Sequence, residues 1–137
     1  MRVQIRERAE DELLRYAVIL ARCGGDVVLC RHRERTTWEF PGGHREAGES
    51  IAEAAARELR EETGALEFAL HEVCPYSVED GGVETFGMLF FAEIYRLEPE
   101  LHHEIQEIWR TRTLPENWTY PEVQPVLLAE AKRRGLI

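Results

Sequence analysis

Residues 43–65, GHREAGESIAEAAARELREETGA, decide the expected fold, because they join a glycine-bearing loop to a well-marked helix. Ser50, followed three residues later by Glu53, matches a capping box, in which each residue satisfies the backbone amide of the other at a helix start. Gly64 marks the end of the helix, since glycine commonly follows the last helical residue. The stretch therefore predicts a short helix between Ser50 and Gly64.

Three glutamates of this helix project where the pattern predicts a core or a cleft. At 100° per residue, Glu58, Glu61 and Glu62 fall on the same side as the apolar residues, within an arc of about 100°. Like charges at this spacing repel, and burying them unpaired would cost much more. We expect a positive partner opposite them, and a hard cation with oxygen ligands, Mg²⁺ or Mn²⁺, is the simplest candidate.

A solvated acidic face is the alternative interpretation of the same glutamates, since charged residues are seldom buried. Glu53, Arg57 and Glu61 follow one another at intervals of four residues with alternating charge. This spacing favours a ladder of exposed ion pairs. Such a ladder accounts for Glu61 and leaves Glu58 and Glu62 unexplained.

The fixed residues of the stretch resemble the Nudix box: Gly43, five residues, Glu49, seven residues, and then RELREETG from Arg57 to Gly64. Ala65 follows where the family usually has a larger aliphatic residue, which concerns packing and not chemistry. Nudix enzymes hydrolyse nucleoside diphosphates linked to another group. A match at so many fixed positions in a loop–helix–loop context is highly specific, although the box covers only residues 43–65 of the chain.

The rest of the chain predicts strands around two helices, an α/β class. The resemblance implies the Nudix fold, a mixed curved β-sheet sandwiched between α-helices, as a single domain over residues 1–137. Hairpin turns are expected at Gly24-Gly25-Asp26 and Asp80-Gly81-Gly82. The expected strands cover residues 2–6, 16–21, 27–31, 66–73, 83–95 and 104–112, with 83–95 central. A C-terminal helix with a cap at Thr119 and Glu122 is expected to end near Gly135.

The resemblance also implies roles for individual residues. The implied metal ligands are Glu58, Glu61 and Glu62, with Glu49 as a further ligand or orienting partner and a backbone carbonyl of Gly42 or Gly43 completing the shell. Arg57 is the charge partner of a box glutamate. The general base differs among family members, being a box glutamate, Glu61 or Glu62 here, or a glutamate of a later loop, for which Glu104 is preferred over Glu107 and Glu79.

A basic run precedes the box at residues 31–35, RHRER. Arg31, Arg33 and Arg35 are candidates for binding substrate phosphates opposite the metal site. An exposed strand end is the alternative. His32 alone is not a metal ligand candidate, since a single histidine is more often a surface or hydrogen-bonded residue.

Composition excludes several classes of protein. The net charge of −9 argues against a nucleic-acid polymer as partner. No apolar run approaches the roughly 18 residues of a membrane span, and the charged N-terminus lacks the core of a signal peptide. Three cysteines without a CxxC pair are typical of reduced thiols. We expect a cytoplasmic protein that binds a small nucleotide and no membrane, with a homodimer left open.

The box indicates that a P–O–P linkage is cleaved, but it does not identify the group that is attached to the nucleoside diphosphate. The short chain resembles compact MutT-type members, which act on nucleoside triphosphates, including an oxidised guanine nucleotide such as 8-oxo-dGTP. ADP-ribose, dinucleoside polyphosphates and RNA 5′ ends are alternatives. A non-catalytic nucleotide-binding regulatory module is an alternative of another class, although such proteins usually show gaps among the box carboxylates. A third class of hypothesis is that the acidic helix is purely structural.

Overall fold

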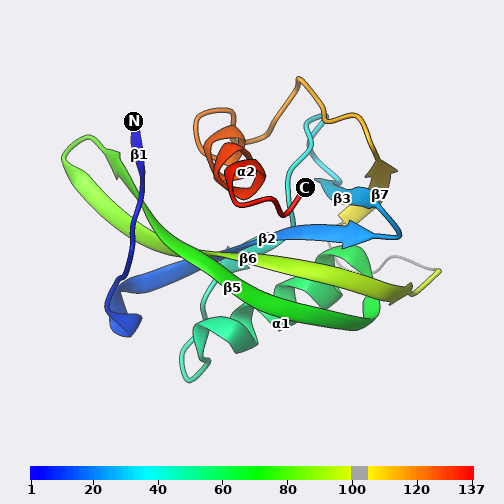
Figure 1. The fold of residues 1–137 in the computed structure, drawn as a ribbon, viewed down its shortest axis with the longest axis horizontal. Coiled ribbons are helices and arrows are strands. Elements are labelled where there is room, and N and C mark those ends of the chain that lie inside the picture. Colours follow the sequence, from blue (N-terminus) through cyan, green and yellow to red (C-terminus); the bar gives the residue numbers. More distant parts are fainter. Residues whose placement is uncertain (100–104) are drawn as a thin grey trace.

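The computed structural model describes residues 1–99 and 105–137, and within them a mixed sheet lies between two helices (Figure 1). In chain order the elements are β1 (Arg2–Ile5), the 3₁₀-helix η1 (Asp11–Leu13), β2 (Leu14–Cys23), β3 (Asp26–His32), β4 (Gly42–His44), α1 (Ile51–Thr63), β5 (Ala65–Asp80), β6 (Val83–Leu97), β7 (Ile105–Thr111) and α2 (Gln124–Arg133). The α/β class and the layered arrangement predicted from the sequence are confirmed.

The sheet runs in the order β1-β5-β6-β2-β3-β7, and β4 pairs with β2 beside this path. β2 and β6 are parallel, while the other pairs are antiparallel. Both predicted hairpins, β2–β3 and β5–β6, are present, and β6 is central as expected. β5 continues to Asp80, well beyond the predicted strand end at Val73, because it pairs along nearly its whole length with β6.

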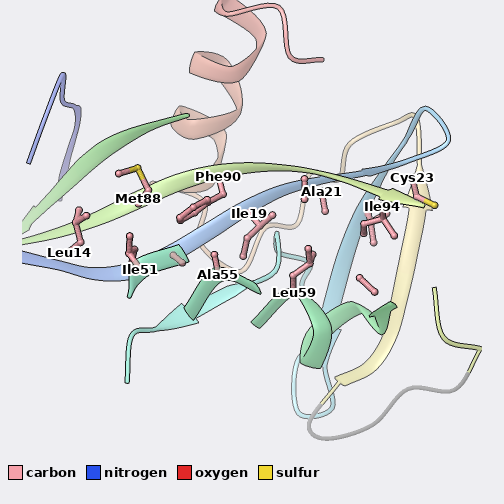
Figure 2. Close-up of a cluster of buried hydrophobic side chains, with 14 residues drawn as sticks. Leu14, Ile19, Ala21, Cys23, Ile51, Ala55, Leu59, Met88, Phe90 and Ile94 are labelled. Atoms are coloured by element: carbon pink, nitrogen blue, oxygen red, sulfur yellow. The ribbon is translucent and has the colours of Figure 1, made fainter. Parts of the chain in front are cut away.

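Two cores cover the two faces of the sheet. Along β2, Ile19 packs toward α1 and Leu20 toward α2, as period-2 alternation requires. Figure 2 shows the α1-side cluster, in which Leu59 of the helix faces Ile19 and Phe90 of the central strands. Because both faces are buried, β2 and β6 read as continuous apolar runs instead of alternating ones.

The predicted ends of α1 are confirmed. The N–H of Glu53 donates to Ser50 Oγ at 3.0 Å, and the N–H of Ser50 donates to the Glu53 carboxylate at 2.9 Å. Gly64 ends the helix with φ 76°, in the left-handed region that glycine adopts without strain. A helix fixed at both ends holds its side chains in a defined direction toward the sheet.

The predicted cap of α2 is wrong. The helix begins after Val123 without a side-chain cap, and Pro125 occupies its first turn. Thr119 instead joins two loops, since its hydroxyl lies 2.7 Å from that of Thr37 and its N–H donates to the carbonyl of Trp38. Neither of the two described helices is long and apolar enough to cross a membrane.

Candidate active site

A cleft of about 880 Å³ opens where β2, β4 and the C-terminal half of α1 meet β5 and the start of α2. Its lining comes from both layers, since Ala17 belongs to the α1-side core and Val18 and Tyr76 belong to the α2-side core. Its acidic wall comprises Gly42, Gly43, Glu58, Glu61 and Glu62. The structure thus brings together the box residues predicted to form the site.

Two glycines allow β4 to approach both β2 and α1 closely. A Cβ on Gly43 would lie 2.5 Å from Glu58 Oε1, and one on Gly42 would lie 2.2 Å from the carbonyl oxygen of Ala17. The N–H of Gly42 donates to Glu62 Oε1 at 2.6 Å. The carboxylates of Glu58 and Glu62 therefore lie against a backbone segment that any larger residue would push away.

Arg57 connects the box carboxylates. Its Nε donates to Glu49 Oε2 at 2.7 Å, its Nη1 donates to Glu58 Oε1 at 2.8 Å, and the same Nη1 lies 3.4 Å from Glu61 Oε2. Its Nη2 donates to the carbonyl of His44 at 3.0 Å. The same Nη1 also lies 3.7 Å from Glu46 Oε1, so one guanidinium is shared by four carboxylates.

The predicted ladder is only half present. The pair Arg57–Glu61 forms, whereas the carboxylate of Glu53 turns back to cap the helix. Glu49 does not line the cleft and lies behind Arg57, which binds both of its carboxylate oxygens. This position suits an orienting partner better than a ligand.

The carboxylates around Arg57 differ in electrostatic environment. Hydrogen bonds from Arg57 and from the backbone of Glu46 lower the pKa of Glu49 to about 2. Burial, reinforced by the charge of Glu62, raises the pKa of Glu58 to about 7 despite its contact with Arg57. Negative charge at Glu58 is thus poorly compensated by the surrounding protein, which favours the approach of a cation.

A second polar group, which sequence reasoning did not identify, extends the acidic wall. His32 Nε2 lies 3.0 Å from Glu62 Oε2 and 3.2 Å from Glu39 Oε1, and Arg35 Nη1 lies 3.4 Å from the same Glu39 oxygen. Glu39 is 6% exposed, and burial raises its pKa to about 7, with His32 opposing the shift. The hydrogen bond to Glu62 raises the pKa of His32. The sequence signal for Glu39 was its position as a single charged residue between the apolar residues Trp38 and Phe40.

Of the three arginines predicted to bind phosphates, Arg35 alone lines the cleft. Arg31 instead pairs with Glu107 at 2.8 Å and covers the ring of Trp38 at 5.7 Å. Arg31 and His32 are neighbours on β3, so their side chains point to opposite faces. Of the predicted set Arg31, Arg33 and Arg35, the structure therefore places Arg35 at the cleft, together with His32, and phosphate binding there stays a prediction.

Two of the three candidate general bases from the later segments, Glu107 and Glu79, belong to the described part of the chain. Glu104 lies outside the described residues. Glu107 is engaged by Arg31 away from the cleft, and Glu79 stands opposite Arg2 and Glu84 near the β5–β6 turn. Neither Glu107 nor Glu79 lines the cleft.

The acidic wall has the donor chemistry of a hard-cation site, because its side-chain donors are carboxylate oxygens. Within residues 1–99 and 105–137, however, no three acidic, cysteine or histidine side chains are arranged to share one metal ion. Arg57 and His32 engage their oxygens instead. The space that the absent Cβ of Gly43 leaves beside Glu58 nevertheless fits the predicted metal chemistry.

Comparison with known proteins agrees with this geometry. The family model described as NUDIX domain matches residues 13–129. YtkD of Bacillus subtilis, whose name gives 8-oxo-dGTP diphosphatase as a provisional activity, is 33% identical over 129 residues, covering 87% of this chain and 81% of YtkD. An RNA pyrophosphohydrolase of Xanthomonas oryzae is 45% identical over 49 residues, which are 36% of this chain and 24% of that protein.

Solved structures show the same fold. A mutant form of the Bacillus subtilis pyrophosphohydrolase BsRppH superposes with a TM-score of 0.82 at 29% identity, covering 98% of this chain and 92% of that chain. A UDP-X diphosphatase superposes with a TM-score of 0.74 at 17% identity, covering 95% of this chain and 67% of that one. The second likeness concerns the fold alone.

Proposed function

The chain belongs to the Nudix hydrolase family, and from this we propose that it is a Mg²⁺-dependent pyrophosphohydrolase of nucleoside triphosphates. One observation carries the proposal: Glu58 and Glu62 lie against Gly42 and Gly43 in an open cleft, with more carboxylates than Arg57 can neutralise. Such a wall repels a phosphate chain unless a cation lies between them.

The residues that would hold the ion are Glu58, Glu61, Glu62 and the carbonyl of Gly43, with Mg²⁺ as the expected ion and Mn²⁺ as a substitute. When bound, the metal supplies charge neutralisation at the phosphate oxygens and makes coordinated water more acidic. Glu49 acts behind them by fixing Arg57, which in turn orients Glu58 and Glu61.

The protein contributes charge and a proton acceptor. Arg35 lines the cleft beside Glu39 and is our proposed ligand for a substrate phosphate. A carboxylate near the attacking water takes its proton. Glu104 remains our proposed base, and Glu61, whose side chain is 38% exposed in the cleft, is the alternative among the described residues.

The activities named for the relatives suggest two candidate substrates. The match to YtkD over most of both chains supports a nucleoside triphosphate, with 8-oxo-dGTP as one form. A triphosphorylated RNA 5′ end is the second candidate, because BsRppH and the Xanthomonas protein are named as pyrophosphohydrolases, the latter of RNA. A net charge of −9 disfavours extended contact with RNA and does not prevent the entry of one 5′ end.

The test is the release of phosphate or pyrophosphate in the presence of Mg²⁺ from a panel of substrates. The panel contains dGTP, 8-oxo-dGTP, the other triphosphates, ADP-ribose, a dinucleoside polyphosphate and a triphosphorylated RNA oligonucleotide. Glu62→Gln is the control, because its amide oxygen can still accept the Gly42 N–H. We expect triphosphate turnover that falls at least about 100-fold in this variant, since metal-assisted charge stabilisation is lost. Wild-type turnover in Glu62→Gln would contradict the assignment.

A further inference from the structure

The cleft has a second compartment beyond its acidic wall, beside α2. Its lining includes Phe40 and Tyr76, which are 2% and 3% exposed, together with Val18, Val78 and Val123. All five belong to the α2-side core or pack against it. An apolar, partly aromatic floor of this kind suits a flat heterocycle better than a phosphate chain.

One buried amide opens into this compartment. Gln124 is 3% exposed, and its Oε1 accepts a hydrogen bond from the N–H of Phe40 at 2.8 Å. A backbone N–H can only donate, so this bond fixes which end of the amide carries the oxygen. The Nε2 group, with its two hydrogens, must therefore point away from Phe40.

The Nε2 group of Gln124 is available to a ligand. It has no hydrogen-bond partner among residues 1–99 and 105–137. The described side-chain atoms that are both sealed from solvent and unpartnered are Arg22 Nε and Glu93 Oε2, so Gln124 Nε2 remains accessible from the cleft that the residue lines. A ligand in the cleft can therefore accept a hydrogen bond from this group.

Tyr76, which lines the same compartment, carries a second polar group, and its hydroxyl lies over Gly87 of the sheet. Its ring crosses Gly87 so closely that a Cβ there would lie 2.5 Å from the hydroxyl, and within the described part of the chain the hydroxyl has no hydrogen-bond partner. Burial raises the pKa of this phenol, so the group is neutral and can either donate or accept. It adds affinity for a polar heterocycle without choosing between donors and acceptors.

The spacing between the two compartments fits a nucleotide. Gln124 is bound to the N–H of Phe40, and Glu62 is bound to the N–H of Gly42, two residues further along the same segment. Two residues of extended chain span at most about 7 Å. This is the length scale that separates a nucleobase from its 5′ phosphate.

We propose that this compartment binds the nucleobase and that Gln124 selects a base with a keto oxygen at position 6 of the purine, as in guanine or hypoxanthine. The proposal rests on the proposed function, whose substrate it narrows. A fixed amide that presents only donors is complementary to the O6 acceptor of such a base. Adenine places an amino donor at position 6, and the two donors would then face each other.

The experiment compares ITP with ATP, because their bases differ at position 6 and in the N1 proton that accompanies it. We expect kcat/KM to be about tenfold higher for ITP, the size of one net hydrogen bond. Equal hydrolysis of ITP and ATP by the wild-type protein would overturn the proposal.

Two variants test whether the side-chain amide of Gln124 causes the preference for ITP over ATP. Gln124→Met removes the donors, and Gln124→Glu at pH 8.5 replaces them with an acceptor while still accepting the Phe40 N–H. We expect the ITP/ATP ratio to approach one in the first and to fall to one or below in the second. Val126→Ala, on the exposed side of α2, is the control and should keep the wild-type ratio. A wild-type ratio in both Gln124 variants would overturn the assignment.

Failure of the proposed function would be visible separately. If the wild-type protein hydrolyses neither these two nucleotides nor any other member of the substrate panel in Mg²⁺, that function is wrong. Calorimetric titration with ITP and ATP then tests the compartment directly. Tighter binding of ITP that is lost in Gln124→Met would still support the keto-base assignment. Equal dissociation constants would overturn it.

Discussion

Two clusters in this protein combine glutamate with arginine. One has more arginines than glutamates, and the other has more glutamates than arginines. At the C-terminal end of α2, the carboxylate of Glu130 is bound by both Arg133 and Arg134. At the cleft, the guanidinium of Arg57 is shared by Glu46, Glu49, Glu58 and Glu61. The first cluster has an excess of positive charge, and the second has an excess of negative charge.

The pKa values follow these proportions. Hydrogen bonds from two arginines lower the pKa of Glu130 to about 2. Arg57 has the same effect on Glu49, whereas burial raises the pKa of Glu58 to about 7. An ion pair that is complete within the protein is therefore structural, while an incomplete one in a cleft is suited to bind a further cation.

The largest expected effect separates the two clusters by activity. Glu58→Gln should lower kcat/KM for a triphosphate at least about 100-fold, because it removes a negative charge from the proposed metal site. Glu130→Gln makes the same chemical change at the other cluster and should leave kcat/KM within about twofold of wild type. A similar loss in both variants would mean that the comparison reflects folding and not chemistry.

A smaller effect is expected from changing the shape of the cation. Arg57→Lys should lower turnover about tenfold, because an ammonium cannot reproduce the planar set of donors that binds Glu49, Glu58 and the carbonyl of His44 at once. Arg134→Lys is the matched change, and Arg133 remains there to bind Glu130. Steady-state kinetics on both variants measure the difference, and unchanged turnover in Arg57→Lys would remove Arg57 from the positioning role.

The smallest effect concerns stability and pH. Glu130→Gln should lower the free energy of unfolding at pH 7 by at most about 1 kcal/mol, since both arginines are substantially exposed. The folded pKa lies below the ordinary value, so this contribution is present above about pH 4.5 and disappears as the pH falls toward 2. Denaturant unfolding of both proteins across this range should show their stabilities converging. A difference in unfolding free energy that does not change with pH would mean that the substitution acts through packing and not through charge.

Local signals predicted most of the fold. The capping box of Ser50 and Glu53 and the glycine turns of both hairpins depend on residues close in sequence, and the structure contains all of them. The cap at Thr119 failed because a tertiary contact with Thr37, distant in sequence, competes for its hydroxyl. The mixed sheet between helices followed from the family resemblance and not from periodicity, and no strand order was predicted.

The candidate site was predictable where one helix carries it. Glu58, Glu61 and Glu62 share a side of α1 by helical geometry alone. Glu39 and Gln124 come from segments far apart in the chain, which meet through tertiary contacts such as the hydrogen bond from the Phe40 N–H to Gln124. Arg31 was misplaced because strand alternation turns it away from the cleft that its neighbour His32 enters.

The most direct test of the central claim, that the acid-rich cluster binds a hard cation, is a calorimetric Mg²⁺ titration accompanied by thermal unfolding. The proteins compared are the wild type, Glu62→Gln and Glu130→Gln. Binding to the native state should stabilise the wild type and Glu130→Gln by about 2.7 kcal/mol when free Mg²⁺ is 100 times the dissociation constant. Glu62→Gln should lose both the binding heat and this stabilisation. Equal binding by Glu62→Gln, or no Mg²⁺ binding by the wild type, would contradict the account.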